Sequence, residues 1–274
     1  MSMSLDKLYD IEKAKIGKEK GWDANMKIER FYQPNCWRIV WDDGSDAPNE
    51  VLFHMQGVVE GRCLPPFKKT TESRQIKKIR HTCQWITISG LGSSDTFNND
   101  RDGIMEVYAT FARMVNGLGA VEFKKVNDRE AVEFGNRLFT PKEEAPGMEW
   151  ADIGDAVHSM GFMQWVRKNN VGLIYGEENV VRYGEEYTKY ADAKDKSNGK
   201  KRTSDIIPQK IHVGDIVDVG FTMIGVEGGR MSPPKARLLL RTITLIDSSH
   251  AQEWIKTKAK MQVTGNNKKL QTGK

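Results

Sequence analysis

The stretch IHVGDIVDVGFTMI at residues 211–224, followed by ARLLLRTITLID at residues 236–247, decides the fold class of this chain. Both runs are rich in β-branched and aliphatic residues, which interleave with polar ones in the period-2 pattern of strands. Glycine and proline are concentrated between the two runs and predict a turn there. The two runs are therefore expected to pair as antiparallel strands.

Strand patterns return near the N-terminus. Residues 26–31 alternate, and residues 36–41 are aromatic and β-branched; a turn-rich segment at 42–49 then leads to a strand at 50–59. HTCQWITI at 81–88 is a further strand pattern. Because strands lie towards both ends of the chain, one sheet should unite them. We predict an α+β fold, with an antiparallel sheet or partly open, OB-like β-barrel elaborated by two main helices.

The centre of the chain is expected to supply the helices. Residues 103–116 place apolar side chains at helical spacing, with Asp100 or Asp102 as the N-cap. Residues 150–168 form the second candidate, and residues 128–138 are expected to form a short helix.

Composition sets the expected domain boundaries. Residues 1–21 are predicted to be a charged helical extension, and residues 22–260 a single α+β domain. Residues near 190–205 lose apolar content and predict a flexible loop. Residues 261–274 are expected to form a basic disordered tail.

The overall composition excludes several classes of protein. The chain has 274 residues, 38% of them hydrophobic, and no run approaches the ~18 apolar residues of a membrane helix. Its first residues lack the layout of a signal peptide. Three cysteines are too few and too scattered for a disulfide framework. These features predict an intracellular protein without distinguishing nucleus from cytoplasm.

The positive charge is concentrated in two segments. Residues 62–80 carry seven Lys or Arg side chains against one acid, Glu72, and residues 256–274 carry six lysines and no acid. Each segment is therefore +6 in a chain of net charge +5, so everything else sums to −7. Such local basicity is typical of a surface that binds a polyanion. The alternative is a solvated loop and a solubilising tail.

No motif predicts catalysis, a metal or a cofactor. The GLGSS turn at 90–94 lacks the third glycine of a nucleotide-binding loop. NNDRDG at 98–103 resembles half of a calcium loop, but Ala109 stands where a bidentate glutamate is required. His81 and Cys83 have no second ligand pair, so a buried cysteine beside a surface histidine is expected.

Aromatic residues on predicted strands flank the first basic segment. Trp37 and Trp41 lie four residues apart on one strand and should share a face, and Trp85 follows the segment. Rings beside cations suit single-stranded nucleic acid, because every base has a face that can stack. The alternative is that these rings fill the core. The candidate nucleic-acid-binding residues are Lys68, Lys69, Arg74, Lys77, Lys78, Arg80, Trp37, Trp41 and Trp85.

The C-terminal strands also resemble a known family. GDIVDV at 214–219, joined by a variable turn to the alternating run at 236–247, resembles consecutive strands of OB-fold proteins that bind single-stranded DNA. In that family a G-D-x-V-x-V strand precedes a strand of alternating apolar residues. The resemblance covers residues 211–247, and it implies a β-barrel with a single-stranded nucleic acid as partner.

Together these features predict a non-enzymatic protein that prefers single-stranded DNA or RNA and binds it through a basic segment and aromatic stacking. Two alternatives stay open. The first is a protein-interaction or assembly protein that forms homo-oligomers. The second is an enzyme that acts on a charged substrate.

Overall fold

The computed structural model describes residues 26–32, 34–42, 44, 49–67, 78–151, 160–185, 204–228 and 232–251. The predicted N-terminal extension and basic tail lie outside these residues, as does most of the predicted loop near 190–205.

Strands dominate the described part of the chain, with two α-helices and several short 3-10 turns between them. The first half contains β1 (Met26–Tyr32), β2 (Asn35–Trp41), β3 (Asn49–Glu50), β4 (Phe53–Cys63), η2 (Ile79–His81), β5 (Cys83–Ser89), α2 (Asp95–Met114), β6 (Lys124–Val126) and β7 (Arg129–Arg137). The second half contains β8 (Thr140–Pro141), α3 (Met160–Asn169), β9 (Leu173–Ile174), η3 (Glu177–Asn179), β10 (Arg182–Glu185), β11 (Ser204–Asp205), η4 (Pro208–Lys210), β12 (Ile216–Val226) and β13 (Lys235–Asp247).

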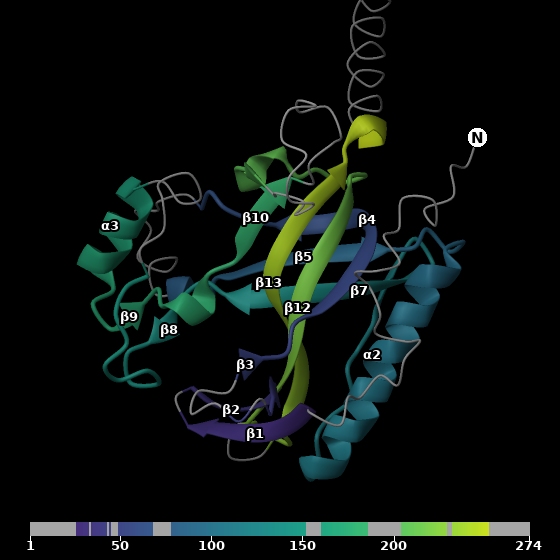
Figure 1. Cartoon of the computed structure of the whole chain (residues 1–274). Coiled ribbons are helices and arrows are strands. Elements are labelled where there is room, and N and C mark those ends of the chain that lie inside the picture. Colours follow the sequence, from purple (N-terminus) through teal and green to yellow (C-terminus); the bar gives the residue numbers. More distant parts are fainter. Residues whose placement is uncertain are drawn as a thin grey trace, which may run out of the picture.

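Five strands close into a barrel in the order β4, β5, β7, β13, β12 and back to β4 (Figure 1). All neighbours pair antiparallel except β7 and β13, which run parallel where Gly135 lies opposite Leu239. Strands β1 and β2 extend the sheet beyond β12, and β10 and β11 extend it beyond β13. The predicted α+β fold with an OB-like barrel is confirmed, but the ring is closed and its pairing is mixed.

The predicted C-terminal hairpin is the longest pairing among the described strands. β12 and β13 pair antiparallel from Ile216 to Val226, with register shifts after Ile216 and after Gly220. Such irregularities bend a strand and increase its twist, which helps a sheet to close. The same β12 also pairs with β2 and β4, so one sheet does unite the two ends of the described chain.

The main core is built from apolar side chains that alternate along the strands with outward-facing residues. Ile86 and Ile88 on β5 and Val132 and Phe134 on β7 point inward and are buried. Helix α2 adds a buried apolar face that includes Phe111. A second buried cluster packs α3 and β9 against Leu138 and Phe139, and β8 pairs with β9, so these elements form a lobe beside the barrel (Figure 1). None of the helices in the described ranges is long and apolar enough to cross a membrane.

Two predictions for the centre of the chain are wrong. The segment expected to be a short helix is β7, whose inward Val132 and Phe134 alternate with outward Glu133 and Gly135. Pairing on both sides of this strand overrides the helix propensity of its glutamates and alanine. Helix α2 begins at Asp95, not near Gly103.

The start of α2 is set by a serine. The Ser94 hydroxyl accepts a hydrogen bond from the Phe97 amide at 3.2 Å, the usual role of an N-cap side chain. Asp100, expected as a cap, is instead buried within the helix.

Candidate nucleic-acid interface

A groove of about 770 Å³ runs along the outer side of the barrel. Its lining includes Cys83 and Trp85 of β5, Gly135 of β7 and Leu239 of β13. These positions alternate with the inward-facing core residues, so they project outward. Residues 120–124, which lead into β6, form one wall. The floor of the groove therefore lies on neighbouring barrel strands, and Arg38 of β2 and Thr140 of β8 also belong to its lining.

Trp85 lies in a trough made by glycines. Gly135 is its partner on β7, and a Cβ built at Gly61 on β4 would lie 3.3 Å from the Trp85 ring. Neither glycine carries a side chain that could cover the indole. The Lys124 ammonium lies 5.5 Å from the ring centroid, within the range of a cation–π contact. Trp85 is thus a half-buried ring with a cation beside it.

The charges that line the groove are balanced. Five cations (Arg38, Lys124, Arg137, Lys235 and Arg237) face five carboxylates (Glu122, Glu133, Glu144, Glu178 and Glu227). Several are already paired: Lys124 with Glu133, and Arg137 with Glu144 at 2.9 Å. Within the described ranges, Lys235 and Arg237 form no ion pair. The groove alone is therefore not a basic patch, and these two side chains are its available cations.

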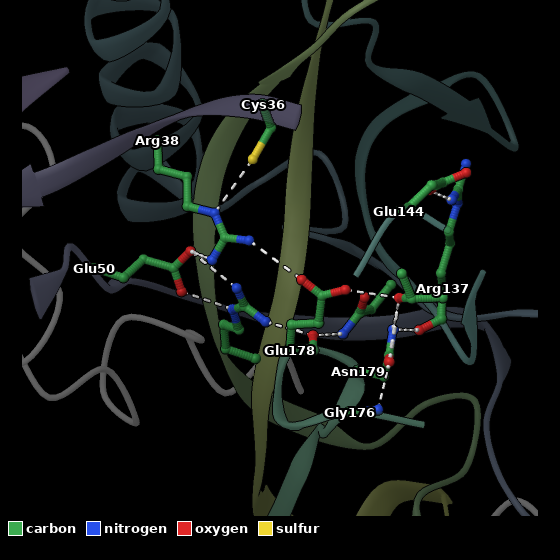
Figure 2. A network of polar contacts seen from close by, with 11 residues as sticks. Cys36, Arg38, Glu50, Arg137, Glu144, Gly176, Glu178 and Asn179 are labelled. Carbon is green, nitrogen blue, oxygen red and sulfur yellow. Dashed lines mark hydrogen bonds and ion pairs between the residues drawn. The ribbon is translucent and has the colours of Figure 1, made fainter. Parts of the chain in front are cut away.

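A network of charged side chains fixes the wall at the β2 side (Figure 2). Arg241 of β13 binds both carboxylate oxygens of Glu50, at 2.8 and 2.9 Å, and donates to the Glu178 carbonyl at 2.7 Å. Arg38 of β2 bridges Glu50 and Glu178 at 3.5 and 3.4 Å. Burial acts to lower the pKa of Arg38, but its hydrogen bond to Cys36 and the nearby carboxylates raise that pKa overall. The network joins β2, β3 and β13 to η3.

Polar contacts also attach η3 to the end of the barrel. Buried Gln84 of β5 donates to the Asn179 carbonyl at 2.9 Å and accepts from the Tyr183 hydroxyl at 3.0 Å. The Asn179 amide donates to the Thr140 hydroxyl at 3.0 Å, and that hydroxyl donates to Glu178 at 2.7 Å. Burial raises the pKa of Tyr183 well above its usual value. The floor and this wall of the groove are therefore tied together.

Cys83 lies at the end of the groove where β5 begins. Contrary to expectation, the residue as a whole is exposed, although neighbouring atoms partly shield its thiol from water. Partial burial raises the pKa of its thiol, although nearby Arg137 and Arg237 act to lower it. Among the described residues no group of three or more acidic, histidine or cysteine side chains is arranged to hold a metal ion.

The structure brings together only some of the predicted site residues. Trp85 lines the groove, whereas Trp37 and Trp41 project from the other face of β2 and pack against the main core. Lys78, next to η2, and Arg80, within it, are exposed in the connection that enters β5 at Cys83. The remaining predicted cations, Lys68, Lys69, Arg74 and Lys77, lie outside the described residues.

Other groove residues were not predicted from the sequence. Lys124, Arg137 and Arg237 lie on separate strands outside the two basic segments, and Phe123 lies outside the aromatic strands near the N-terminus. The alternation of Glu133, Gly135 and Arg137 on one face of β7 was the signal that could have revealed part of the groove.

Comparisons with solved structures find a distant structural likeness. The chain is similar to gp2.5, a single-stranded DNA binding protein encoded by bacteriophage T7, with a TM-score of 0.37 and 10% sequence identity. The match covers 72% of this chain and 86% of that one. No family model matches the sequence. No curated protein matches it either.

Proposed function

We propose that this chain is a non-enzymatic protein that binds single-stranded nucleic acid in the groove on β5, β7 and β13. The observation that carries the proposal is Trp85, a ring flanked by Gly61 and Gly135 on the floor of a groove. Neither glycine places a side chain between a planar base and this ring, beside which the Lys124 ammonium lies. Base stacking on aromatic side chains contributes about 1–3 kcal/mol per base in proteins that bind single strands.

The position of the groove in the barrel supports the same function. In OB-folds the outer face of the second and third strands, together with the loops beside it, binds oligonucleotides and oligosaccharides. Here β5 and β7 are the second and third strands of the ring along the chain. The β4–β5 connection reaches one end of the groove at Cys83, and Glu227 and Lys235 at the ends of the β12–β13 connection line another part.

The groove and the basic segment have different roles in this proposed binding. The balanced charges in the groove give little net attraction for phosphates. The β4–β5 connection holds the +6 segment, which supplies that attraction and so raises affinity without reading sequence. Lys78 and Arg80, on the described part of this segment, are exposed beside the start of β5.

The test fills the trough next to Trp85. In Gly135→Val, the new Cβ would meet its nearest neighbours at 3.6 Å, an ordinary contact, and valine suits a strand better than glycine does. We expect the variant to fold as stably as the parent chain but to bind oligo(dT) about fivefold more weakly or worse, the equivalent of losing one stacked base.

A charge pair provides the matched control. Arg237→Glu reverses a charge inside the groove. Arg182→Glu makes the same change at an exposed position of β10, outside the groove. Only the groove variant should lose affinity in fluorescence anisotropy titrations. If Gly135→Val and Arg237→Glu both bind like the parent, the groove is not the nucleic-acid site.

A second candidate function, homo-oligomer assembly, is favoured by the edge strand β1. Among the described strands β1 pairs only with β2, and Tyr32 at its end is 73% exposed. Antiparallel pairing of two copies about Ile28 would set Lys27 against Glu29 twice, an opposite-charge arrangement that stabilises cross-strand pairs. Sedimentation of the parent, Lys27→Glu and the charge-swapped double variant tests this. Dimers that are lost in the single variant and restored in the double would support assembly.

A further inference from the structure

We infer that a bound single strand continues from the groove into a second site on the α3 lobe, where Trp150 and Arg167 receive one more nucleotide. This inference rests on the proposed function, because it assigns the path of the same ligand. The site is a separate cavity of about 580 Å³ lined by Lys142, Glu149, Trp150, Arg167, Val171 and Leu173.

The cavity joins a planar cation to an aromatic ring. The Arg167 guanidinium lies 4.3 Å from the centroid of the Trp150 ring. The Phe139 ring lies against Trp150, with the two ring centroids 6.2 Å apart, and the Ala151 amide next to Trp150 donates to the Tyr175 carbonyl at 2.7 Å. Bases in single strands stack on arginine planes as well as on aromatic rings. The pair therefore offers a preformed stacking surface.

The rest of the lining suits a nucleotide. Lys142 and Arg167 supply two cations against one carboxylate, Glu149, so phosphate is favoured here more than in the balanced groove. Val171, 73% exposed, gives an apolar rim for the sugar or the base edge. Val171 lies beside a tryptophan and two cations and is not a member of the second core cluster.

The two cavities are neighbours along one short segment. Thr140 lines the groove, and Lys142, two residues further on, lines the second cavity. β8 ends at Pro141, and the turn that follows carries Lys142 in the lining of the second cavity and Glu144 in the lining of the groove. The Lys142 amide donates to the Gly172 carbonyl at 2.9 Å, so the segment is held against the lobe. Figure 1 shows β8, β9 and α3 beside the end of the barrel that β7 reaches.

The experiment uses oligonucleotide length as the discriminating variable. Oligo(dT) of about 6 and about 16 nucleotides, near the two ends of the range occupied by one OB-fold, are titrated against the full chain. The variant Arg167→Glu is compared with Lys168→Glu, the same charge change at the next exposed position of α3, outside the cavity. Trp150→Phe, which retains an apolar ring for the second core cluster, is measured in parallel.

We expect Arg167→Glu to weaken binding of the long oligonucleotide about 5- to 150-fold, the range of one stacked base, and to leave the short one unchanged. Lys168→Glu should bind both lengths like the parent. Trp150→Phe should weaken the long oligonucleotide alone and by less. Equal losses at both lengths would overturn the inference, because the cavity would then belong to the primary site.

The two proposals fail in different ways. If Arg167→Glu changes neither length while Arg237→Glu weakens both, the second site is wrong and the groove stands. If the parent chain binds neither oligonucleotide, the proposed function itself is wrong, and the second site falls with it.

Discussion

At the scale of single residues, the position of each tryptophan on its strand decides which role it can have. Trp37 and Trp41 share a face of β2, as their spacing predicts, and both pack against the main core. Trp85 lies on the outer face of β5 in the groove. The three rings therefore do not form one platform, and the stacking hypothesis concentrates on Trp85.

One pair of variants separates the two roles. Trp41→Ala should destabilise the fold by about 3 kcal/mol, because it removes a ring packed against the core. Trp85→Ala should cost much less stability but about 1–3 kcal/mol of binding free energy. Urea unfolding and oligonucleotide titration of both variants measure the two free energies. If the Trp41→Ala variant unfolds like the parent but binds oligonucleotide weakly, then Trp41 belongs to the binding surface and not to the core.

Cys83 offers a chemical probe of the groove. Because partial burial raises the pKa of its thiol, less thiolate is present at neutral pH than in a free cysteine, and iodoacetamide should react slowly. The rate should keep rising with pH beyond the ~8.5 at which an ordinary thiol is half ionised. Peptide mass spectrometry after timed alkylation measures each cysteine separately. Saturating oligo(dT) should protect Cys83, and unchanged labelling would show that the ligand lies elsewhere.

At the scale of elements, the Arg241–Glu50 pair connects β13 to the short strand β3. Arg241→Leu leaves the half-buried Glu50 carboxylate with fewer partners and removes a donor from the Glu178 carbonyl, and removing one member of a buried ion pair costs about 3–5 kcal/mol. Because Glu50 is only partly buried, the loss of unfolding free energy should lie near the lower end of this range. The double variant Arg241→Leu with Glu50→Leu should recover much of it, as chemical denaturation would show. Additive losses in the double variant would mean that the two side chains are not coupled.

The elements that were predicted correctly have strong local patterns. The hairpin of β12 and β13 and the aromatic strand β2 alternate over many residues, so their type can be inferred from sequence. β7 was missed because its outward positions hold Glu133 and Gly135, which are poor strand residues that only the groove explains. The start of α2 was not predicted because its first two turns, Asp95 to Asp102, hold a single apolar residue, Phe97, and so show no helical spacing of apolar side chains.

The groove itself could not be predicted from local patterns. Its lining comes from β2, β5, β7, β13 and η3, which become neighbours only when the ring closes. The basic segment and Trp85 were predicted from charge and aromatic content. Arg237 and Gly135 were not, because a single exposed arginine or glycine has no distinguishing context in sequence.

At the scale of the whole molecule, the C-terminal residues 263–274 are predicted to contribute to binding and not to folding. They contain few apolar side chains that could be buried and no acid. A chain ending at residue 262 should therefore keep its melting temperature while losing a modest part of its affinity at low salt. Differential scanning calorimetry and titrations at two salt concentrations measure both effects. A large fall in melting temperature would mean that the tail packs on the body.

The second whole-molecule prediction concerns how affinity depends on salt. If the 62–80 segment contacts phosphates, changing Lys68, Lys69, Lys77 and Lys78 to Gln should weaken binding of every oligonucleotide sequence alike. The slope of log affinity against log salt should flatten by about 0.7 for each lost contact with a single strand.

Charge alone could mimic this result, so the control removes the same number of cations elsewhere. Exposed cations outside both cavities are changed to Gln together: Lys125, Lys168, Arg182 and Lys210. Long-range attraction falls equally in both variants, but only direct contacts release the counterions that set the slope. In the variant of the 62–80 segment, the slope of log affinity against log salt should therefore flatten by up to about 3. In the control variant the slope should change little. Equal slopes in the two variants would mean that the 62–80 segment is a solvated loop and that the groove alone binds the oligonucleotide.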